Sequence, residues 1–289
     1  MKIIVLGASG QIGSVIHNGL KKNHQVMGTS RKPSAKLTQF DPFENDWSSL
    51  GTADVLINCV GQIEPAAASS FQHVHVELTK RIIEHRQKVG NPRVVQISAL
   101  GASAEHEVEF LRTKGIADEL LLRHAQTIVI RPSIVCTHGT MIVRKMRMLS
   151  NIARFSFGIV PVPKGFLQTM IQPIMSEDLV DLVRKLCNDD QHTLVDAVGP
   201  EPIAFREIIA IMFQARKQKV RLIELRKIIT DVLVKSIVSP AFPNVINSQQ
   251  YQLLFEDNVA DPRIAEHILQ RPMAPTREFF KNEFSYASN

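Results

Sequence analysis

Tyrosine, cysteine and long apolar runs are all scarce in this sequence. Its 289 residues include two tyrosines, three cysteines and one tryptophan. No stretch of about twenty uninterrupted apolar residues occurs, so we expect no transmembrane helix. The first residues are typical of a strand that belongs to the folded domain and not of a signal peptide.

The three cysteines do not fit a disulfide framework. Cys59, Cys136 and Cys187 are far apart and odd in number, which favours buried thiols in a reducing compartment. The histidines show no metal-ligand spacing, and His73 and His75 face different directions on a predicted helix. We therefore expect no metal site and a cytoplasmic location, with a peripheral position on the inner face of a membrane left open.

The composition is that of an ordinary globular protein. Hydrophobic residues make up 44% of the chain and charged residues 21%. The length fits one large domain, or a domain with a smaller lobe. The net charge of +6 is mild and by itself selects no partner.

A glycine-rich turn directly follows the first predicted strand. Residues 2–6 (KIIVL) are apolar and β-branched, and a helical pattern covers residues 14–22. Between them, Gly7 permits a tight turn, Gly10 lets the backbone approach a pyrophosphate, and Gly13 lets the helix pack on the strand. The helix N-terminus supplies amide donors and a positive dipole end. We expect a dinucleotide to bind here, contacted by Gly7, Ser9, Gly10, Gln11, Ile12 and Gly13.

The end of the second predicted strand bears on the choice of cofactor. An acidic residue at this position usually binds the ribose hydroxyls of NAD, whereas an arginine accommodates the extra phosphate of NADP. Here the strand ends in Ser30, Arg31 and Lys32, with no acid. Arg31 can form a bidentate pair with the phosphate. We expect NADP(H) to be preferred, with NAD(H) as the alternative, and Asp41 to contact the adenine.

Strands and helices alternate through the first half of the chain. This rhythm predicts a doubly wound parallel sheet, an α/β Rossmann fold. After about residue 139 the rhythm fails, which predicts a core over residues 1–140 and a smaller, mainly helical lobe over residues 141–289, interleaved with the last sheet elements. The predicted strands beyond the first are residues 25–29, 55–60, 93–97 and 127–130, and the predicted helices include one with Phe71, Val74, Leu78 and Ile82 on a single face and one over residues 115–124.

The second half is rich in basic residues. A helical pattern over residues 141–157 and a mostly helical one over residues 205–238 both carry many arginines and lysines. Solvated faces of amphipathic helices are the favoured interpretation. The alternative is a surface for a protein partner or an anionic membrane; nucleic acid is not expected. The residues considered for it are Arg144, Arg147, Arg216, Lys217 and Lys219.

Several of these motifs resemble the extended short-chain dehydrogenase/reductase superfamily. They are the glycine triplet, residues 58–61 (NCVG) and residues 130–133 (IRPS). The resemblance implies that Val60, Gly61 and Pro132 line the dinucleotide. It also implies a Tyr-x-x-x-Lys pair with a nearby serine, in which tyrosine transfers a proton and lysine holds the nicotinamide ribose.

The tyrosine of that pair is missing. The matching residues 110–114 (FLRTK) keep Lys114 and place Phe110 where the tyrosine belongs. Phenylalanine has no proton to transfer. The two tyrosines, Tyr251 and Tyr286, are too distant in sequence to restore the motif. Ser98 stands at the matching strand end, although Leu100 occupies one alignment of the catalytic serine.

Further motifs resemble an atypical branch of the superfamily, which includes the Rossmann-fold accessory subunit of respiratory complex I and its bacterial relatives. They are residues 97–102 (ISALGA), 171–174 (IQPI), 176–179 (SEDL), 198–202 (VGPEP) and 249–258 (QQYQLLFEDN). This resemblance implies NADP(H) bound tightly as a structural element. NmrA-like redox-sensing regulators, which also lack the tyrosine, are similar too.

Two hypotheses follow. The favoured one is a nucleotide-binding module that uses NADP(H) for sensing, binding or assembly. The other is an NAD(P)-dependent oxidoreductase or epimerase acting on a carbonyl or sugar nucleotide. Its proton donor would be Ser98, His106 or an ordered water, because hydride transfer belongs to the cofactor.

Overall fold

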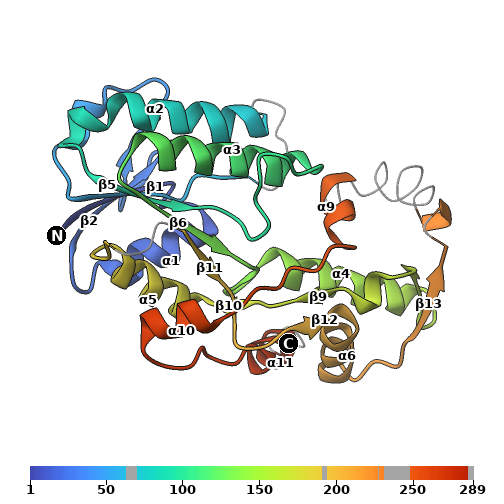
Figure 1. Cartoon of the computed structure of the whole chain (residues 1–289). Helices are drawn as coiled ribbons and strands as arrows, with labels where there is room; N and C mark the ends of the chain where they lie inside the picture. Colours follow the sequence, from blue (N-terminus) through green and yellow to red (C-terminus); the bar gives the residue numbers. More distant parts are fainter. Residues whose placement is uncertain (63–69, 191–193, 227, 231–247, 286–289) are drawn as a thin grey trace.

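A seven-stranded sheet forms the centre of the amino-terminal part of the protein (Figure 1). The computed structural model describes residues 1–62, 70–190, 194–226, 228–230 and 248–285. Within them the strand order is β11-β6-β5-β4-β1-β2-β3, and all neighbours pair in parallel. The predicted doubly wound parallel sheet is thereby confirmed.

The order of the strands reverses at β1. The chain runs outward from β1 to β2 and β3, then returns to place β4 on the other side of β1. Ligands of open α/β sheets bind beyond the carboxyl ends of the strands at such a switch point. The glycine-rich turn after β1 lies at this position.

Helices cover both faces of the sheet, and short strands form small additional pairs. In chain order the elements are β1 (Lys2–Leu6), α1 (Gln11–Leu20), β2 (Gln25–Ser30), β3 (Thr38–Gln39), η1 (Trp47–Leu50), β4 (Val55–Asn58), η2 (Gln72–Glu77), α2 (Leu78–His85), η3 (Arg86–Val89), β5 (Arg93–Ile97), α3 (Glu109–His124), β6 (Thr127–Pro132), β7 (Val135–Cys136), α4 (Met141–Phe155), β8 (Ile159–Pro163), η4 (Phe166–Gln168), β9 (Met170–Ile171), β10 (Ile174–Met175), α5 (Ser176–Leu186), β11 (Leu194–Ala197), β12 (Ile203–Ala204), α6 (Phe205–Ala215), β13 (Arg221–Leu225), α9 (Ser248–Leu253), α10 (Arg263–Leu269) and α11 (Arg277–Ser285).

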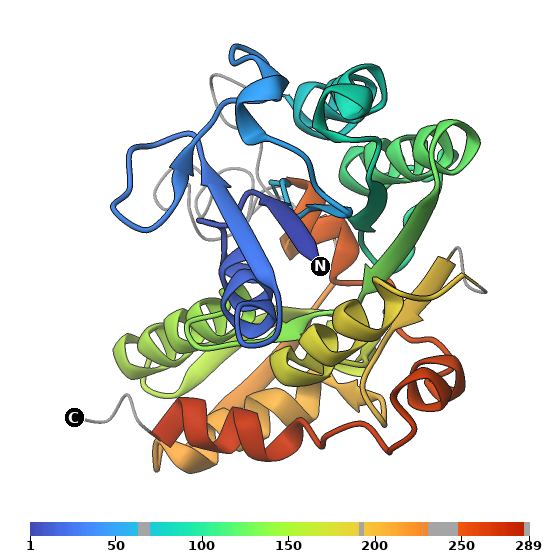
Figure 2. The ribbon, with the colours of Figure 1, turned by 90° about the vertical axis from the view of Figure 1, so that its left-hand side faces the viewer.

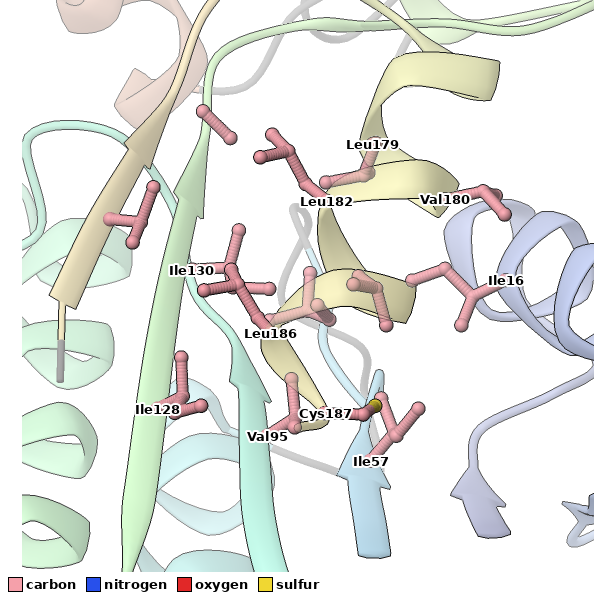
Figure 3. Close-up of a cluster of buried hydrophobic side chains, with 14 of the residues drawn as sticks. Ile16, Ile57, Val95, Ile128, Ile130, Leu179, Val180, Leu182, Leu186 and Cys187 are labelled. Atoms are coloured by element: carbon pink, nitrogen blue, oxygen red, sulfur yellow. The ribbon is translucent and has the colours of Figure 1, made fainter. Parts of the chain in front are cut away.

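One face of the sheet is covered by α1, α5 and α10 (Figures 1 and 2). Figure 3 shows how α5 fits there: Leu179, Leu182 and Leu186 point from the helix toward the strands. They pack against strand residues such as Ile57 and Ile130. Residues 3–4 and 7 apart lie on one side of a helix, so this spacing turns an apolar stripe to the sheet.

The opposite face is covered by α2 and α3. The predicted helix face with Phe71, Val74, Leu78 and Ile82 is confirmed, since all four side chains are buried. The helix is not regular, however. Its first part, η2, is a π-helix, in which each turn takes one extra residue; such turns are frequent at functional sites.

The remaining elements form a second lobe with its own core. α4, α6 and α11 pack together with β8, β9 and β12 around Phe166, Ile208, Phe280 and their neighbours. The chain does not divide cleanly at residue 140, because α5, β11 and α10 return to the large sheet. The predicted interleaving therefore has a structural counterpart, while the division into two domains stays a prediction.

Several element boundaries differ from those predicted. α1 begins at Gln11 and α3 at Glu109, each earlier than the apolar pattern indicated. The stretch predicted as mostly helical from residue 205 begins with the helix α6, as predicted, but residues 221–225 form β13, because pairing with β8 outweighs their helical pattern. Residues 231–238 of that prediction lie outside the described residues.

The three cysteines are the scarce residues whose surroundings the structure describes: Cys136 and Cys187 are buried, as predicted, and Cys59 is half-buried. Cys59, Cys136 and Cys187 are free thiols, and burial raises the pKa of Cys59 to about 12. Across the described residues, His, Cys, Asp and Glu form no cluster that could hold a metal ion. In the same residues, no helix has both the length and the apolarity to cross a membrane.

Two glycines of α1 allow a matched test of how tightly this helix packs. An ideal Cβ on Gly13 would lie 2.2 Å from the carbonyl oxygen of Gly7, whereas one on Gly19 would meet the side chain of Val180 at 2.4 Å. Alanine gains up to about 1 kcal/mol of helix propensity at either site. We expect Gly13→Ala to lower the free energy of unfolding by about 1–3 kcal/mol, because a backbone carbonyl cannot move aside.

The matched variant Gly19→Ala should lose less, because its Cβ would meet atoms of the Val180 side chain and no backbone atom. Urea denaturation of both variants without nucleotide measures the difference. Equal losses would contradict the rigid contact at Gly13.

Candidate functional site

The glycine-rich turn meets the loop after β4 at the switch point. Gly7 has a φ of +76°, which favours glycine, and an ideal Cβ there would lie 3.0–3.2 Å from atoms of Cys59 and Val60. Backbone hydrogen bonds fix both loops. The Cys59 amide donates to the Leu6 carbonyl and the Ala8 amide donates to the Thr29 carbonyl, each at 3.0 Å. The structure thus brings the predicted residues Gly7 and Val60 into contact.

Gly10 and Gly13 do different work in this turn. Gly13 is buried under the Gly7 carbonyl, so the fold itself requires a glycine there. Gly10 has an ordinary extended conformation, and its ideal Cβ would contact one atom, the Gly7 oxygen at 3.2 Å. Packing among the described residues therefore demands glycine less strictly at Gly10 than at Gly13, where a Cβ would lie 2.2 Å from the same oxygen. A ligand approaching the backbone would need glycine at Gly10, which fits the pyrophosphate of a dinucleotide.

The N-terminus of α1 also suits an anion. Residues 1–62 are all described, and within them the first turn of α1 has neither an acidic residue nor a side-chain cap. The predicted contact residues Ser9 and Gln11 are exposed there, while Ile12 is half-buried against the core. The positive end of the helix dipole is therefore left for a bound phosphate.

The predicted phosphate-binding residues lie at the end of β2, next to the turn. Ser30 is buried and its Oγ accepts a hydrogen bond from the Lys32 amide at 3.2 Å. Arg31 and Lys32 are exposed. Asp41 has a local role: its carboxylate accepts from the Phe43 amide at 2.9 Å and shapes the turn after β3. The predicted contact of Asp41 with adenine stays a prediction.

Lys114 is buried at the same edge of the sheet. Its side chain runs from α3 toward β5, where Nζ donates to the Ile97 carbonyl at 3.0 Å. An ideal Cβ on Gly61 would lie 3.2 Å from this Nζ, so the structure joins two further predicted residues. Burial lowers the pKa of Lys114, and the nearby Asp118 and Cys59 oppose that shift.

Phe110 lies one helical turn before Lys114 and packs into an aromatic cluster. Its ring makes edge-on contacts with Phe71 and His75, with ring centroids 5.9 and 5.8 Å apart. Phe110 is half-buried, and no polar atom of its own can reach a ligand. The position of the expected tyrosine is thus filled by an apolar ring beside the lysine.

His75 is a site residue that the sequence reasoning missed. It is buried in the π-helix η2, and its Nδ1 lies 2.8 Å from Thr113 Oγ1. Thr113 Oγ1 also lies 2.8 Å from the Glu109 carbonyl oxygen. Burial, and next the charge of Lys114, lower the pKa of His75 to about 2. The signal was its place on the Phe71–Val74–Leu78 face.

Ser98 is one of the two side chains considered as proton donors, and its side chain faces α3. Its hydroxyl donates to Asp118 Oδ2 at 2.7 Å, and Arg131 Nε donates to the same oxygen at 3.1 Å. Burial raises the pKa of Asp118, opposed by these two hydrogen-bond donors and by Lys114. Asp118 follows Lys114 by one turn, and this i, i+4 spacing was the sequence signal for the buried pair.

The second candidate, His106, is held by the C-terminal segment. Its Nδ1 accepts from the Val108 amide at 3.0 Å, and Nε2 lies 3.2 Å from Glu256 Oε2. Beyond Glu256, Asn258 links the ends of other strands. Its side-chain Oδ1 accepts a hydrogen bond from the Ser133 hydroxyl, and its backbone amide donates to the Met170 carbonyl. Pro132, predicted to line the cofactor, is buried at the end of β6.

The structure does not bring the five basic residues considered for a partner surface together as one exposed patch. Arg147 is half-buried, and its guanidinium donates to the backbone carbonyl of Glu283 at 2.7 Å. The same guanidinium lies 3.5 Å from the side-chain carboxylate of Glu283. Arg216 is half-buried as well, whereas Arg144, Lys217 and Lys219 are exposed. Arg147 therefore does not fit the alternative of a partner surface made of all five residues, because its charge is used inside the lobe.

Two curated proteins are similar to this chain over most of its length. The mitochondrial 40 kDa subunit of NADH-ubiquinone oxidoreductase from Neurospora crassa is 22% identical over 280 residues, covering 89% of this chain and 72% of that protein. Subunit 9 of the NADH dehydrogenase [ubiquinone] 1 alpha subcomplex from Arabidopsis thaliana is 24% identical over 238 residues. That match covers 76% of this chain and 58% of the plant protein, so the chain spans little more than half of its length.

Solved structures extend the likeness of the fold to the whole chain. UDP-glucuronic acid 4-epimerase from Bacillus cereus, solved with UDP-glucuronic acid and NAD, superposes with a TM-score of 0.72 at 15% identity. It covers 99% of this chain and 98% of its own. Residues 3–115 match the profile of the NAD dependent epimerase/dehydratase family. The part of the chain from β1 to just beyond Lys114 is therefore similar to the NAD dependent epimerase/dehydratase family, and the whole chain shares its Rossmann fold with the solved epimerase.

Proposed function

We propose that this protein binds NADP(H) at the switch point as a sensing, binding or assembly module, without turning the cofactor over. The pyrophosphate would lie over Gly10 at the N-terminus of α1, and the ribose of the nicotinamide beside Lys114. The 2′-phosphate would lie at Arg31 and Lys32, the two cations that follow β2. Bound there, the cofactor would be able to supply hydride chemistry.

The observation that carries this proposal is the lysine without a proton donor. Lys114 is buried and oriented, but Phe110 beside it is apolar. The Ser98 hydroxyl already donates its hydrogen bond to the buried Asp118. Burial lowers the pKa of His75 to about 2, so its imidazole is neutral at physiological pH and cannot act as a general acid in the imidazolium form. A site that keeps the ribose contact and lacks the acid supports binding over turnover.

The curated relatives give this proposal a context. One is named as a subunit of mitochondrial NADH-ubiquinone oxidoreductase, and the other as a subunit of mitochondrial NADH dehydrogenase [ubiquinone]. A role of this chain as a nucleotide-dependent part of an assembly would agree with those names. The alternative is an NAD(P)-dependent oxidoreductase or epimerase, which is favoured by the epimerase neighbours. His106 is its strongest candidate acid, because it is half-buried beside Glu256.

Gly10 provides a test of the binding site that leaves the fold alone. We expect Gly10→Val to abolish NADPH binding, because a branched side chain would occupy the space of the pyrophosphate. The free energy of unfolding without nucleotide should change by less than about 1 kcal/mol, since a Cβ there meets one atom at 3.2 Å.

Calorimetric titration with NADPH and urea denaturation measure the two quantities. NADPH should raise the melting temperature of the parent and leave that of Gly10→Val unchanged. A variant that binds NADPH with parental affinity would place the phosphates elsewhere.

Arg31 tests the choice between the two cofactors. We expect the parent to bind NADPH more tightly than NADH by about 1.5–3 kcal/mol, the size of a charge-assisted pair with the 2′-phosphate. Arg31→Ala should remove most of this difference and leave NADH binding nearly unchanged. Lys36→Ala, another exposed cation of the same loop, is the matched control and should keep the preference. Equal affinity of the parent for NADPH and NADH would refute the proposed preference for NADPH.

Phe110 decides between module and enzyme. We expect negligible NADPH oxidation by the parent against a panel of aldehydes, ketones and quinones. Phe110→Tyr restores a proton donor beside a lysine, and turnover should rise on the order of ten- to a thousandfold. Phe110→Leu controls for the altered packing against Phe71 and His75. Steady turnover by the unmodified protein would overturn the binding module.

A further inference from the structure

An apolar tip projects from the second lobe at the end of α4. Phe155 and Phe157 are 86% and 99% exposed, and Ile152, Ile159 and Ile223 beside them are exposed as well. We call these five residues the phenylalanine tip. In Figure 1 its elements, α4 and β13, lie at the end of the molecule opposite the N-terminus. Side chains this apolar are normally buried, so the tip calls for a function.

The backbone holds the tip in its exposed position. Phe157 has a φ of +53°, an unfavourable conformation for a bulky side chain. Hydrogen bonds on both sides fix it: the Gly158 amide donates to the Ala153 carbonyl at 2.8 Å, and the Arg221 amide donates to the Gly158 carbonyl at 2.7 Å. Strained residues that the surroundings enforce tend to mark functional sites.

The pair β8 and β13 extends the tip into an exposed sheet face. Along β8, Val160 and Val162 point into the lobe, while Ile159 and Pro161 face outward. The register pairs Ile159 with Arg221 and Pro161 with Ile223, so these outward residues share one face. Three apolar side chains and the cation of Arg221 thus share the surface next to Phe157.

The charges around the tip are almost all positive. One acidic residue, Glu224, lies on β13, and it is paired with Arg206 at 3.8 Å. Among the described residues, no carboxylate pairs with the six exposed cations that border the tip in the chain. They are Arg154, Lys164, Lys217, Lys219, Arg221 and Arg226.

We propose that the phenylalanine tip docks on an anionic lipid bilayer. The two phenylalanines would enter the interface between headgroups and acyl chains, and the surrounding cations would contact the acidic headgroups. The positive charge selects an acidic surface. The shape selects a deformable one, because the tip ends in two protruding rings held by a tight turn. This docking is independent of nucleotide binding.

Flotation with vesicles tests the proposal. The full chain should bind vesicles of phosphatidylcholine and phosphatidylglycerol at low ionic strength, bind phosphatidylcholine alone weakly, and be released by salt. The double variant Phe155→Ser/Phe157→Ser should weaken binding about tenfold or more, because both rings leave the interface. Lys219→Ser/Arg221→Ser should weaken it at low salt.

Matched controls lie on the far parts of the molecule. Leu122→Ser removes an exposed apolar side chain from α3, and Lys21→Ser/Lys22→Ser removes two exposed cations after α1. Both controls should bind vesicles like the parent. The thermal unfolding of every variant is compared with the parent, and the exposed positions should leave it unchanged.

Tryptophan fluorescence gives a second, local readout. The one native tryptophan, Trp47, is 1% exposed and reports nothing from the surface. On adding acidic vesicles, Phe157→Trp should shift its emission to the blue and be quenched by brominated acyl chains, whereas Leu122→Trp should do neither.

Three results would overturn the proposal. They are an absence of binding at low ionic strength, binding that Phe155→Ser/Phe157→Ser leaves unchanged, and an unshifted Phe157→Trp emission in bound protein. Self-association that the double variant abolishes, without vesicle binding, would assign the tip to contacts between copies of the chain.

Discussion

The contact between Gly13 and the carbonyl of Gly7 is the constraint on which the arrangement of the site depends. It allows α1 to start directly over the end of β1, with its N-terminus at the switch point of the sheet. The same close packing brings the turn against the loop after β4, where Gly7 touches Val60. A side chain at either glycine would separate elements whose proximity creates the edge where we propose that the pyrophosphate binds.

The neighbouring strand ends hold a buried polar network that the sheet alone would not need. Between α3, β5 and β6, Ser98 and Arg131 both donate to Asp118 Oδ2, and Lys114 Nζ donates to the Ile97 carbonyl nearby. The other carboxylate oxygen of Asp118, Oδ1, is buried and has no hydrogen-bond partner among the described residues. Removing charges from water is costly, and hydrophobic residues would fill this space at lower cost. Such a network is typical of functional sites, and its lysine ends beside Gly61, at the edge of the sheet where we propose that the cofactor binds.

The second lobe separates two roles that the sequence mixed together. Some of its basic residues serve internal contacts, as Arg147 does with Glu283. Others remain exposed beside the phenylalanine tip, where a turn at Phe157 and Gly158 presents apolar rings to the solvent. Charge counting along the chain treats both groups alike, since it has no measure of burial or distance.

The sequence by itself determined the class of fold, the glycine-rich turn and the loss of the tyrosine. These follow from local rules: alternating apolar runs give strands and helices, and Gly7, Gly10 and Gly13 fit one turn geometry. Phe110 lacks a hydroxyl in any conformation. Much of the site could be predicted in this way, because parallel strands bring their carboxyl ends to one edge.

Only the tertiary structure decided which side chains meet. The hydrogen bonds of Ser98 to Asp118 and of His75 to Thr113 join residues 20 and 38 positions apart in the chain. β13 forms a strand because β8 lies beside it, against its helical pattern. Burial of Lys114 and exposure of Phe157 are likewise set by packing between distant segments. Such contacts have no local signal, since their free energy comes from partners that the sequence does not place.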